Sequence, residues 1–292
     1  MIPPSFDYYV PNSVNDAIGM LKKYGSEAKI LSGGMSLIPL MKLRLANPAF
    51  LIDINRIAGL DHIKEADGFL RIGALAREAD LEKSELIRSK YPLLLDTTLV
   101  IADPLVRNRA TIGGNLAHGD PANDHPAAML ALEAEIAVVG PQGERKIPVA
   151  SFFTDLFTTA LSADEILTEI RIPIPPPGSG GAYFKLERKV GDFATAGVAT
   201  QVTVGKDDLC ERAGIGLTNV GLTPVKAGKA EEALRGKKID GESIKRAAQL
   251  AAEESEPTAD LRGSEEYKRD LVRVLAIRAL NRALERSSRG GK

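Results

Sequence analysis

A nine-residue run near the middle of the chain, residues 173–181 (PIPPPGSGG), limits the fold more than any other stretch of the sequence. Seven of its nine residues are proline or glycine. Proline donates no backbone hydrogen bond and glycine is costly to order, so helices and sheet ladders rarely continue through such a run. With 292 residues, the chain is long enough for a hydrophobic core on each side. We therefore expect two domains that meet at this run.

Helices and strands are expected to alternate before the run. Ser13 precedes apolar residues at helical spacing and Gly25 follows them, which predicts a first helix. A Gly-Pro-Gln-Gly turn between residues 135–139 and 144–149 predicts a hairpin. The patterns predict further helices at residues 76–84 and 126–134, and strands at 28–31, 50–54, 69–72, 135–139, 144–149 and 166–172.

The residues after the run have a different character. Apolar segments joined by polar turns predict antiparallel strands at residues 182–189, 197–204 and 213–220. Amphipathic segments then predict helices at residues 229–234, 242–254 and 265–286. A sheet followed by helices is typical of an α+β domain.

Charge and cysteine content exclude several classes of protein. The 38 Lys and Arg against 39 Asp and Glu leave a formal net charge of -1, so no overall field attracts nucleic acid or an anionic membrane. The single cysteine, Cys210, cannot supply a disulfide, a cysteine-rich zinc site or an iron-sulfur cluster. No apolar run reaches the ~18 residues that cross a bilayer, and the first residues do not resemble a secretory signal. We expect a cytoplasmic protein without a membrane span.

Two glycine pairs are the most informative local features. They lie in residues 32–36 (SGGMS) and 111–115 (TIGGN). Glycine lets backbone amides approach a ligand closely, which suits a diphosphate, although either pair taken alone is more typical of an ordinary turn. Neither pair forms the G-x-G-x-x-G motif of a dinucleotide site, and the chain has no nucleoside-triphosphate P-loop motif. An ordinary NAD or nucleoside-triphosphate site is therefore disfavoured.

Two of the three histidines and two aspartates gather in residues 118–125 (HGDPANDH). Their spacing matches no zinc motif, and a proline-containing loop with aspartates more often caps a helix, so we predict no metal site here. Asp124 has a second interpretation as a hydrogen-bonding partner of a ligand held by the preceding glycine pair. No nucleophile with a base and an orienting group is evident, so we predict no catalytic residue in this chain.

Four segments carry a family resemblance. They are the opening IPPSFDYYVP, residues 31–54 (LSGGMSLIPLMKLRLANPAFLIDI), residues 107–134 (RNRATIGGNLAHGDPANDHPAAMLALEA) and residues 183–199 (YFKLERKVGDFATAGVA). Together they resemble the FAD-binding medium subunits of molybdenum hydroxylases, the family of the aerobic carbon monoxide dehydrogenase medium chain and the xanthine dehydrogenase FAD subunit. The resemblance covers essentially the whole chain.

The resemblance implies an α+β fold with two parts. Residues 1–175 would form a vanillyl-alcohol-oxidase (PCMH)-type FAD-binding domain made of two α/β subdomains. Residues 180–288 would form a smaller α+β domain, an antiparallel sheet plus helices, similar to the C-terminal domain of the carbon monoxide dehydrogenase flavoprotein.

The resemblance also implies which residues bind FAD. Both glycine segments would donate backbone amides to the diphosphate, Asp124 would hydrogen-bond the cofactor, and Lys185 would lie near the flavin ring that Phe193 covers. Ile101 and Leu167 would line the site. The matching positions are Ser32, Gly33, Gly34, Met35, Ser36, Leu37, Ile101, Thr111, Ile112, Gly113, Gly114, Asn115, Asp124, Leu167, Lys185 and Phe193.

Three of these positions depart from the common family pattern. Ser32 and Met35 stand where the carbon monoxide enzymes commonly have Ala and His, and Phe193 stands where Tyr is common. Contacts made by backbone amides should survive such changes. Hydrogen bonds from the replaced His and Tyr side chains would be lost, which changes how the protein tunes the redox properties of the flavin.

The function that the resemblance implies is electron transfer. Electrons would pass from a large molybdopterin-containing subunit through 2Fe-2S clusters of a small subunit to FAD on this chain, and then to an external acceptor, in a dimer of heterotrimers. One alternative is a self-contained FAD-dependent oxidoreductase of the same fold, for which the ~110 residues after the run leave little room for a cap domain. A further alternative is an assembly subunit whose flavin loops no longer bind FAD, which the retained glycines disfavour.

Overall fold

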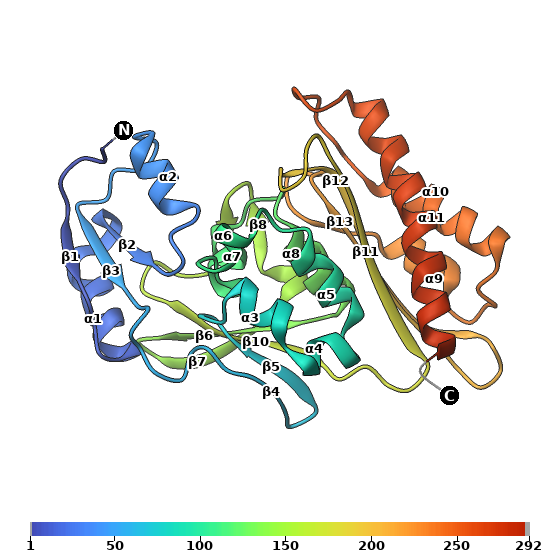
Figure 1. The fold of residues 1–292 in the computed structure, drawn as a ribbon, viewed down its shortest axis with the longest axis horizontal. Coiled ribbons are helices and arrows are strands. Elements are labelled where there is room, and N and C mark those ends of the chain that lie inside the picture. Colours follow the sequence, from blue (N-terminus) through green and yellow to red (C-terminus); the bar gives the residue numbers. More distant parts are fainter. Residues whose placement is uncertain (1, 290–292) are drawn as a thin grey trace.

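The computed structural model describes residues 2–289. Figure 1 shows three groups of elements side by side along the long axis of the molecule. The N-terminal group is a small parallel sheet with two helices, the middle group is a larger sheet covered by short helices, and the C-terminal group is an antiparallel sheet covered by long helices.

The N-terminal group is a three-stranded parallel sheet in the order β1-β3-β2. The Ser13 hydroxyl accepts a hydrogen bond from the Asp16 amide and so caps the first helix, whose Ile18 and Leu21 are buried. The helix predicted between Ser13 and Gly25 is thus confirmed. The elements are β1 (Asp7–Tyr9), α1 (Val14–Tyr24), η1 (Gly25–Glu27), β2 (Ala28–Leu31), α2 (Leu37–Lys42) and β3 (Phe50–Asp53).

The middle group is a five-stranded antiparallel sheet in the order β4-β5-β10-β6-β7. Its helices pack on one face of the sheet and form the largest hydrophobic core with it. The strands are β4 (Ile63–Ala66), β5 (Phe69–Gly73), β6 (Glu135–Gly140), β7 (Gly143–Pro148) and β10 (Ile166–Pro173), beside the small hairpin of β8 (Phe153–Asp155) and β9 (Thr158–Thr159). The helices are α3 (Glu78–Lys83), α4 (Glu85–Lys90), α5 (Pro92–Leu99), α6 (Pro104–Arg107), α7 (Ile112–His118), α8 (Asp124–Ala131) and η2 (Val149–Ser151).

The C-terminal group is an antiparallel sheet whose strands follow one another in order. Its strands are β11 (Ser179–Glu187), β12 (Ala194–Val204), β13 (Cys210–Thr218) and β14 (Val225–Lys226), and its helices are α9 (Gly228–Leu234), α10 (Gly241–Glu254) and α11 (Glu265–Arg289). Strand β11 begins inside the proline- and glycine-rich run, which corrects the expectation that no ladder enters it. A Cβ at Gly180 would overlap the Ala283 carbonyl oxygen, so glycine there allows α11 to lie directly on β11.

Helix α8 of the middle group packs on the opposite face of this C-terminal sheet. A Cβ at Gly214 would overlap the carbonyl oxygen of Ala131, and one at Gly216 would overlap that of Ala127. The helix backbone therefore rests on the strand backbone with no side chain between them. The C-terminal sheet is thus held between α5 and α8 on one side and α9 and α11 on the other, with α10 packed against α9 and α11. Residues from both halves of the chain are therefore held in fixed positions relative to one another.

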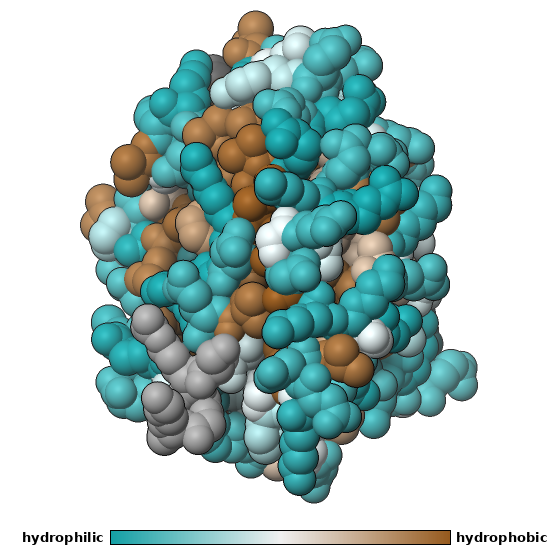
Figure 2. Space-filling model, turned by 90° about the vertical axis from the view of Figure 1, so that its right-hand side faces the viewer, coloured by the Kyte–Doolittle hydropathy of each residue, from teal (hydrophilic) through white to brown (hydrophobic). Residues whose placement is uncertain are grey.

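Figure 2 shows the side of the molecule formed by the C-terminal helices. Hydrophilic side chains cover most of this face, and apolar side chains are visible in a strip between them. Half-buried apolar residues of α10 and α11 include Leu250, Leu271 and Ile277. Within residues 2–289, no helix is long and apolar enough to cross a membrane.

Candidate functional site

The first glycine segment joins β2 to α2. Gly33 is buried, and Gly34 has a φ of +77°, a conformation that favours glycine. Among the described residues, none accepts a hydrogen bond from the backbone N–H groups of Gly33, Gly34, Met35 or Ser36. Backbone amides are rarely left unpaired, and a run of them forms a concave site that attracts an anion.

The second glycine segment is not a loop, because Thr111 caps α7 and both glycines lie in the first turn of that helix. Its amides are already paired: Ile112 donates to the Ala76 carbonyl at 3.1 Å, Gly113 to the Ala74 carbonyl at 3.1 Å, and Gly114 to the Thr111 hydroxyl at 3.2 Å. Asn115 donates to the Thr111 carbonyl at 2.9 Å. These four amides are thus not free for a diphosphate, contrary to the expectation that both segments would donate them.

The fold nevertheless brings the two segments together. The hydroxyl oxygens of Ser32 and Thr111 lie 2.7 Å apart, and a Cβ at Gly33 would overlap the Arg109 carbonyl oxygen. The side-chain oxygen Oδ1 of Asn115 is buried and has no hydrogen-bond partner among the described residues. Free amides on one side and an unpaired buried acceptor on the other fit a bound polar group such as a dinucleotide.

Residues that the sequence analysis did not single out hold the first segment in place. Asn55, just beyond the carboxyl end of β3, donates from Nδ2 to the Ser32 carbonyl at 2.7 Å. Arg77 donates to Oδ1 of Asn55 and to the Arg109 carbonyl. Polar residues at the carboxyl end of a parallel strand often lie at a ligand site, and this signal in the sequence could have identified Asn55.

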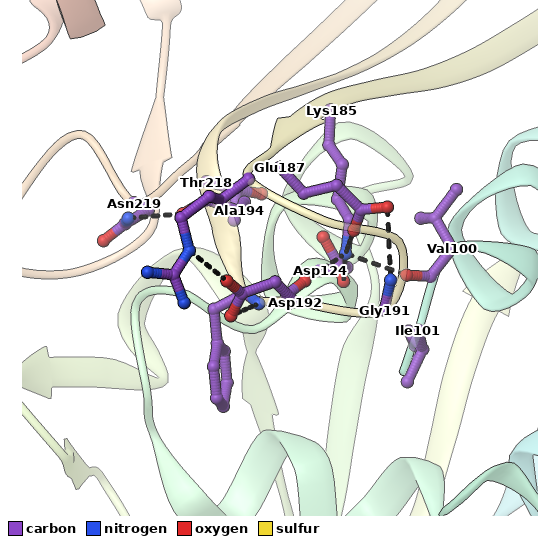
Figure 3. Close-up of polar contacts among 12 residues, drawn as sticks. Val100, Ile101, Asp124, Lys185, Glu187, Gly191, Asp192, Ala194, Thr218 and Asn219 are labelled. Carbon is purple, nitrogen blue, oxygen red and sulfur yellow. Dashed lines mark hydrogen bonds and ion pairs between the residues drawn. The ribbon is translucent and has the colours of Figure 1, made fainter. Parts of the chain in front are cut away.

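A second cluster surrounds the ammonium group of Lys185 (Figure 3). Its Nζ donates to the Val100 carbonyl at 2.8 Å, to Oδ2 of Asp124 at 3.0 Å and to the Asp192 carbonyl at 3.1 Å. Oδ1 of Asp124 accepts a hydrogen bond from the Tyr183 hydroxyl at 2.6 Å. Lys185 therefore ties together β11, the start of α8, the end of α5 and the loop before β12.

Both carboxylate oxygens of Asp124 already accept hydrogen bonds from side chains of this chain. Burial raises the pKa of Asp124, while the Lys185 charge and the hydrogen bonds from Tyr183 and Lys185 act in the opposite direction without cancelling that rise. Burial and the adjacent Asp124 raise the pKa of Tyr183 well above its usual 10.0. Both Asp124 oxygens have partners, so this residue is a structural anchor in the described chain before any ligand is considered.

The loop between β11 and β12 lies beside this cluster. The Gly191 amide donates to Oε1 of Glu187 at 3.2 Å, and a Cβ at Gly191 would lie 2.8 Å from the Ala102 carbonyl oxygen. Arg262, in the loop before α11, donates to Oδ1 of Asp192 at 3.1 Å. Phe193 follows with 49% of its surface exposed, so the fold leaves about half of this residue uncovered.

The other residues predicted to bind FAD lie partly in the hydrophobic core and partly beside the two clusters. Ile101, Ile112 and Leu167 are buried, with Leu167 in β10 as part of the largest core. Met35 is half-buried in the first segment, and Leu37 begins α2. The structure thus gathers the predicted residues into two clusters, one at the first glycine segment and one at Lys185, with α7 and the start of α8 between them. Asn123 links these helices by donating to the Asn115 carbonyl at 3.0 Å.

Comparison with known protein families finds two matches along the chain. Residues 4–175 match the family model for the FAD binding domain in molybdopterin dehydrogenase, and residues 181–283 match that for the CO dehydrogenase flavoprotein C-terminal domain. These matches confirm the α+β fold expected from the sequence. The first match covers more than half of the chain.

Individual relatives are similar in sequence over almost the full length of this chain. The carbon monoxide dehydrogenase medium chain of Hydrogenophaga pseudoflava is 45% identical over 98% of this chain and 99% of its own. The 6-hydroxypseudooxynicotine dehydrogenase complex subunit alpha of Paenarthrobacter nicotinovorans is 39% identical over 98% of this chain and 97% of its own. A solved structure of the Hydrogenophaga enzyme, in a form lacking the Mo-pyranopterin moiety, has a TM-score of 0.95 at 46% identity and covers 98% of this chain and 99% of that one. The chain therefore belongs to the family of FAD-binding medium subunits of molybdenum hydroxylases, and carbon monoxide dehydrogenase medium chains are among the relatives of this chain.

Proposed function

We propose that this chain carries FAD as the electron-transfer subunit of a heteromeric molybdenum hydroxylase. It would receive electrons from 2Fe-2S clusters of a small partner subunit and pass them to an external acceptor, while a large molybdopterin-containing subunit oxidises the substrate. The single cysteine supports this division, because cysteine-ligated clusters need several thiolates and must then lie on partner chains. We also propose a dimer of heterotrimers and a cytoplasmic location.

The observation that carries the proposal is the run of four unpaired amides from Gly33 to Ser36. We assign them to the FAD diphosphate, because they offer hydrogen bonds to anionic oxygens without any need for overall positive charge. Ser32 and Thr111 hold the edge of this site, and the buried Oδ1 of Asn115 would accept a hydrogen bond from the cofactor.

The second cluster is assigned to the flavin ring. Bound FAD supplies the redox chemistry, accepting and releasing electrons. Lys185 would place a fixed positive charge near the ring, and the exposed Phe193 is available to cover it. Asp124 would act by holding Lys185 and Tyr183 as well as by contacting the cofactor. Gly34, Met35, Ser36, Leu37, Ile101, Ile112, Gly113, Gly114 and Leu167 complete the proposed FAD site, and residues 1–175 and 180–288 its two domains.

The alternative of a self-contained oxidoreductase is less well supported. Such an enzyme needs a base beside the flavin, and both oxygens of the buried Asp124 already accept hydrogen bonds from Tyr183 and Lys185. Two relatives of similar length are named for different substrates, carbon monoxide and 6-hydroxypseudooxynicotine. We therefore place the choice of substrate in the large subunit.

Ser36→Asp tests the diphosphate site. Ser36 is exposed, and a carboxylate at the N-terminus of α2 favours the helix, so the fold should be as stable as before. The new negative charge would repel the diphosphate and should weaken FAD binding about tenfold or more. FAD content and dissociation constant are measured beside those of Ser36→Asn, which is neutral and similar in shape. Equal FAD affinity in the two variants would contradict the assignment.

A further inference from the structure

Arg109 lies where the second glycine segment meets the first. Its carbonyl oxygen occupies the space that a Cβ at Gly33 would need, and the same carbonyl accepts a hydrogen bond from Arg77. Its amide donates to the Val106 carbonyl at 2.9 Å. The backbone of Arg109 is therefore fixed directly against the segment with the four unpaired amides.

The guanidinium of Arg109, in contrast, has no direct partner among the described residues. The side chain is exposed, and within residues 2–289 it forms no hydrogen bond or ion pair. Asp53 is a nearby carboxylate, but its Oδ2 accepts from the Tyr8 hydroxyl and its Oδ1 accepts from the Asn55 amide at 2.8 Å and from Asn55 Nδ2 at 2.6 Å. Asp53 is therefore satisfied without Arg109, which leaves the Arg109 charge available.

The backbone contact between Arg109 and Gly33 keeps this free charge close to the segment, and its effect on two neighbouring groups agrees with that position. Burial raises the pKa of Asp53, but hydrogen bonds from Tyr8 and Asn55 together with the Arg109 charge lower it overall. Burial, and then repulsion by Arg109, lowers the pKa of Arg77. Both residues flank Asn55, which holds the Ser32 carbonyl, so the charge of Arg109 acts at the edge of the first glycine segment.

We propose that the Arg109 guanidinium binds the diphosphate of FAD and supplies the charge that the neutral amides of residues 33–36 lack. This inference rests on the proposed function. Amides give directional hydrogen bonds but no net charge, whereas a guanidinium can form paired, charge-assisted hydrogen bonds with phosphate oxygens. A free arginine at the edge of a run of unpaired amides combines both kinds of recognition. Arg109 is thus a cofactor-binding residue of this chain.

The test compares Arg109→Gln, Arg109→Lys and Arg56→Gln in the protein as it is purified, alone or with its partners. FAD release is followed by the rise in flavin fluorescence at increasing salt concentration. Arg56 is a matched control because it is also exposed and lies near Tyr8, yet among the described residues no hydrogen bond or ion pair joins it to the first segment. Arg109→Gln should release FAD about tenfold faster and with a weaker dependence on salt. Arg109→Lys should keep most of the salt dependence, and Arg56→Gln should behave like the wild type.

The outcomes separate this inference from the function on which it rests. If Arg109→Gln releases FAD like the wild type while Ser36→Asp still loses it, the amides bind the diphosphate alone and the inference is wrong. If neither variant changes FAD release, the first segment does not hold the diphosphate and both proposals fail. If Arg56→Gln accelerates release as much as Arg109→Gln, the effect is one of general charge and the specific role is overturned.

Discussion

At the scale of single residues, the Lys185 ammonium joins segments that are far apart in sequence. It is almost fully buried and lies 3.0 Å from Oδ2 of Asp124, which is also buried. A buried charge that loses its partner is strongly destabilising, whereas a neutral pair of similar shape is often tolerated. The lysine and the aspartate should therefore be energetically coupled.

Lys185→Met should reduce the free energy of unfolding by about 3 kcal/mol, because it leaves the buried Asp124 carboxylate without its lysine partner. Adding Asp124→Asn should recover part of that loss. The Lys185 charge lowers the pKa of Asp124, so its removal raises that pKa further, and the folded variant gains more from protonation than the wild type does. The deficit of Lys185→Met should therefore shrink as the pH falls. Denaturant unfolding of the three variants at neutral and acidic pH measures both effects, and strictly additive losses would argue against the coupling.

Family resemblance assigned Asp124 and Lys185 separately to the FAD site, and their pairing with each other was not predicted. Tyr183 and Thr218 complete the cluster, with their hydroxyl oxygens 3.0 Å apart, yet nothing in their local sequence marks them. The free amides at Gly33 to Ser36 were equally beyond local patterns, because whether an amide is paired depends on chain segments that pack nearby only in the folded protein. The same reason explains why the second glycine segment was expected to donate amides that the fold already uses.

At the scale of elements, direct contact between α8 and β13 fixes the middle group on the C-terminal sheet. The contact depends on the absence of a side chain at Gly214 and Gly216. A glycine-x-glycine pattern in a strand indicates close approach of another backbone, so this feature was available in the sequence.

Gly216→Ala should reduce the free energy of unfolding by about 2 kcal/mol, because the new Cβ overlaps the Ala127 carbonyl and α8 must shift. Gly19→Ala is the matched control. Gly19 lies inside α1 with no atom within 4 Å of the added Cβ, so alanine there should stabilise the protein by about 0.5–1 kcal/mol. Thermal or denaturant unfolding measures both variants. Equal effects of the two substitutions would contradict the proposed contact.

Glu169 on β10 links strands of the middle sheet through its side chain. It accepts hydrogen bonds from Arg71, at 3.0 and 3.1 Å, and interacts with Arg171 and with His62 at 2.8 Å. Burial raises the pKa of Glu169, but these hydrogen bonds outweigh burial and lower it below its usual 4.5. A lowered carboxyl pKa contributes stability above pH 4.5 that is lost as the pH falls through the folded-state value.

Glu169→Gln should therefore reduce the free energy of unfolding by about 2 kcal/mol at neutral pH, in line with hydrogen bonds to charged groups. The difference between this variant and the wild type should shrink below pH 4.5, because protonation of Glu169 removes the same interactions from the wild type. Urea unfolding curves across this pH range provide the measurement. A difference independent of pH would rule out the ionised carboxylate as its source.

At the scale of the whole molecule, periodicity and breaker residues predicted most long elements. Strand β2 and helices α1, α9 and α10 begin and end at or within a residue or two of the expected positions. Short helices such as α2, α4 and α6 were missed, because a few residues give no amphipathic pattern. Helix α7 was missed because its glycine pair indicates a turn, whereas the Thr111 cap and contacts with the segment around Ala74 hold it helical.

We propose that this chain works as one subunit of a larger redox enzyme. The most direct measurement is to tag the chain in its source cell, purify it under native conditions, and quantify FAD, iron and molybdenum together with the sizes of the co-purifying chains. We predict stoichiometric FAD and two further chains that bring molybdenum and iron. A lone flavoprotein, reduced directly by a simple substrate, would contradict it and favour the self-contained oxidoreductase.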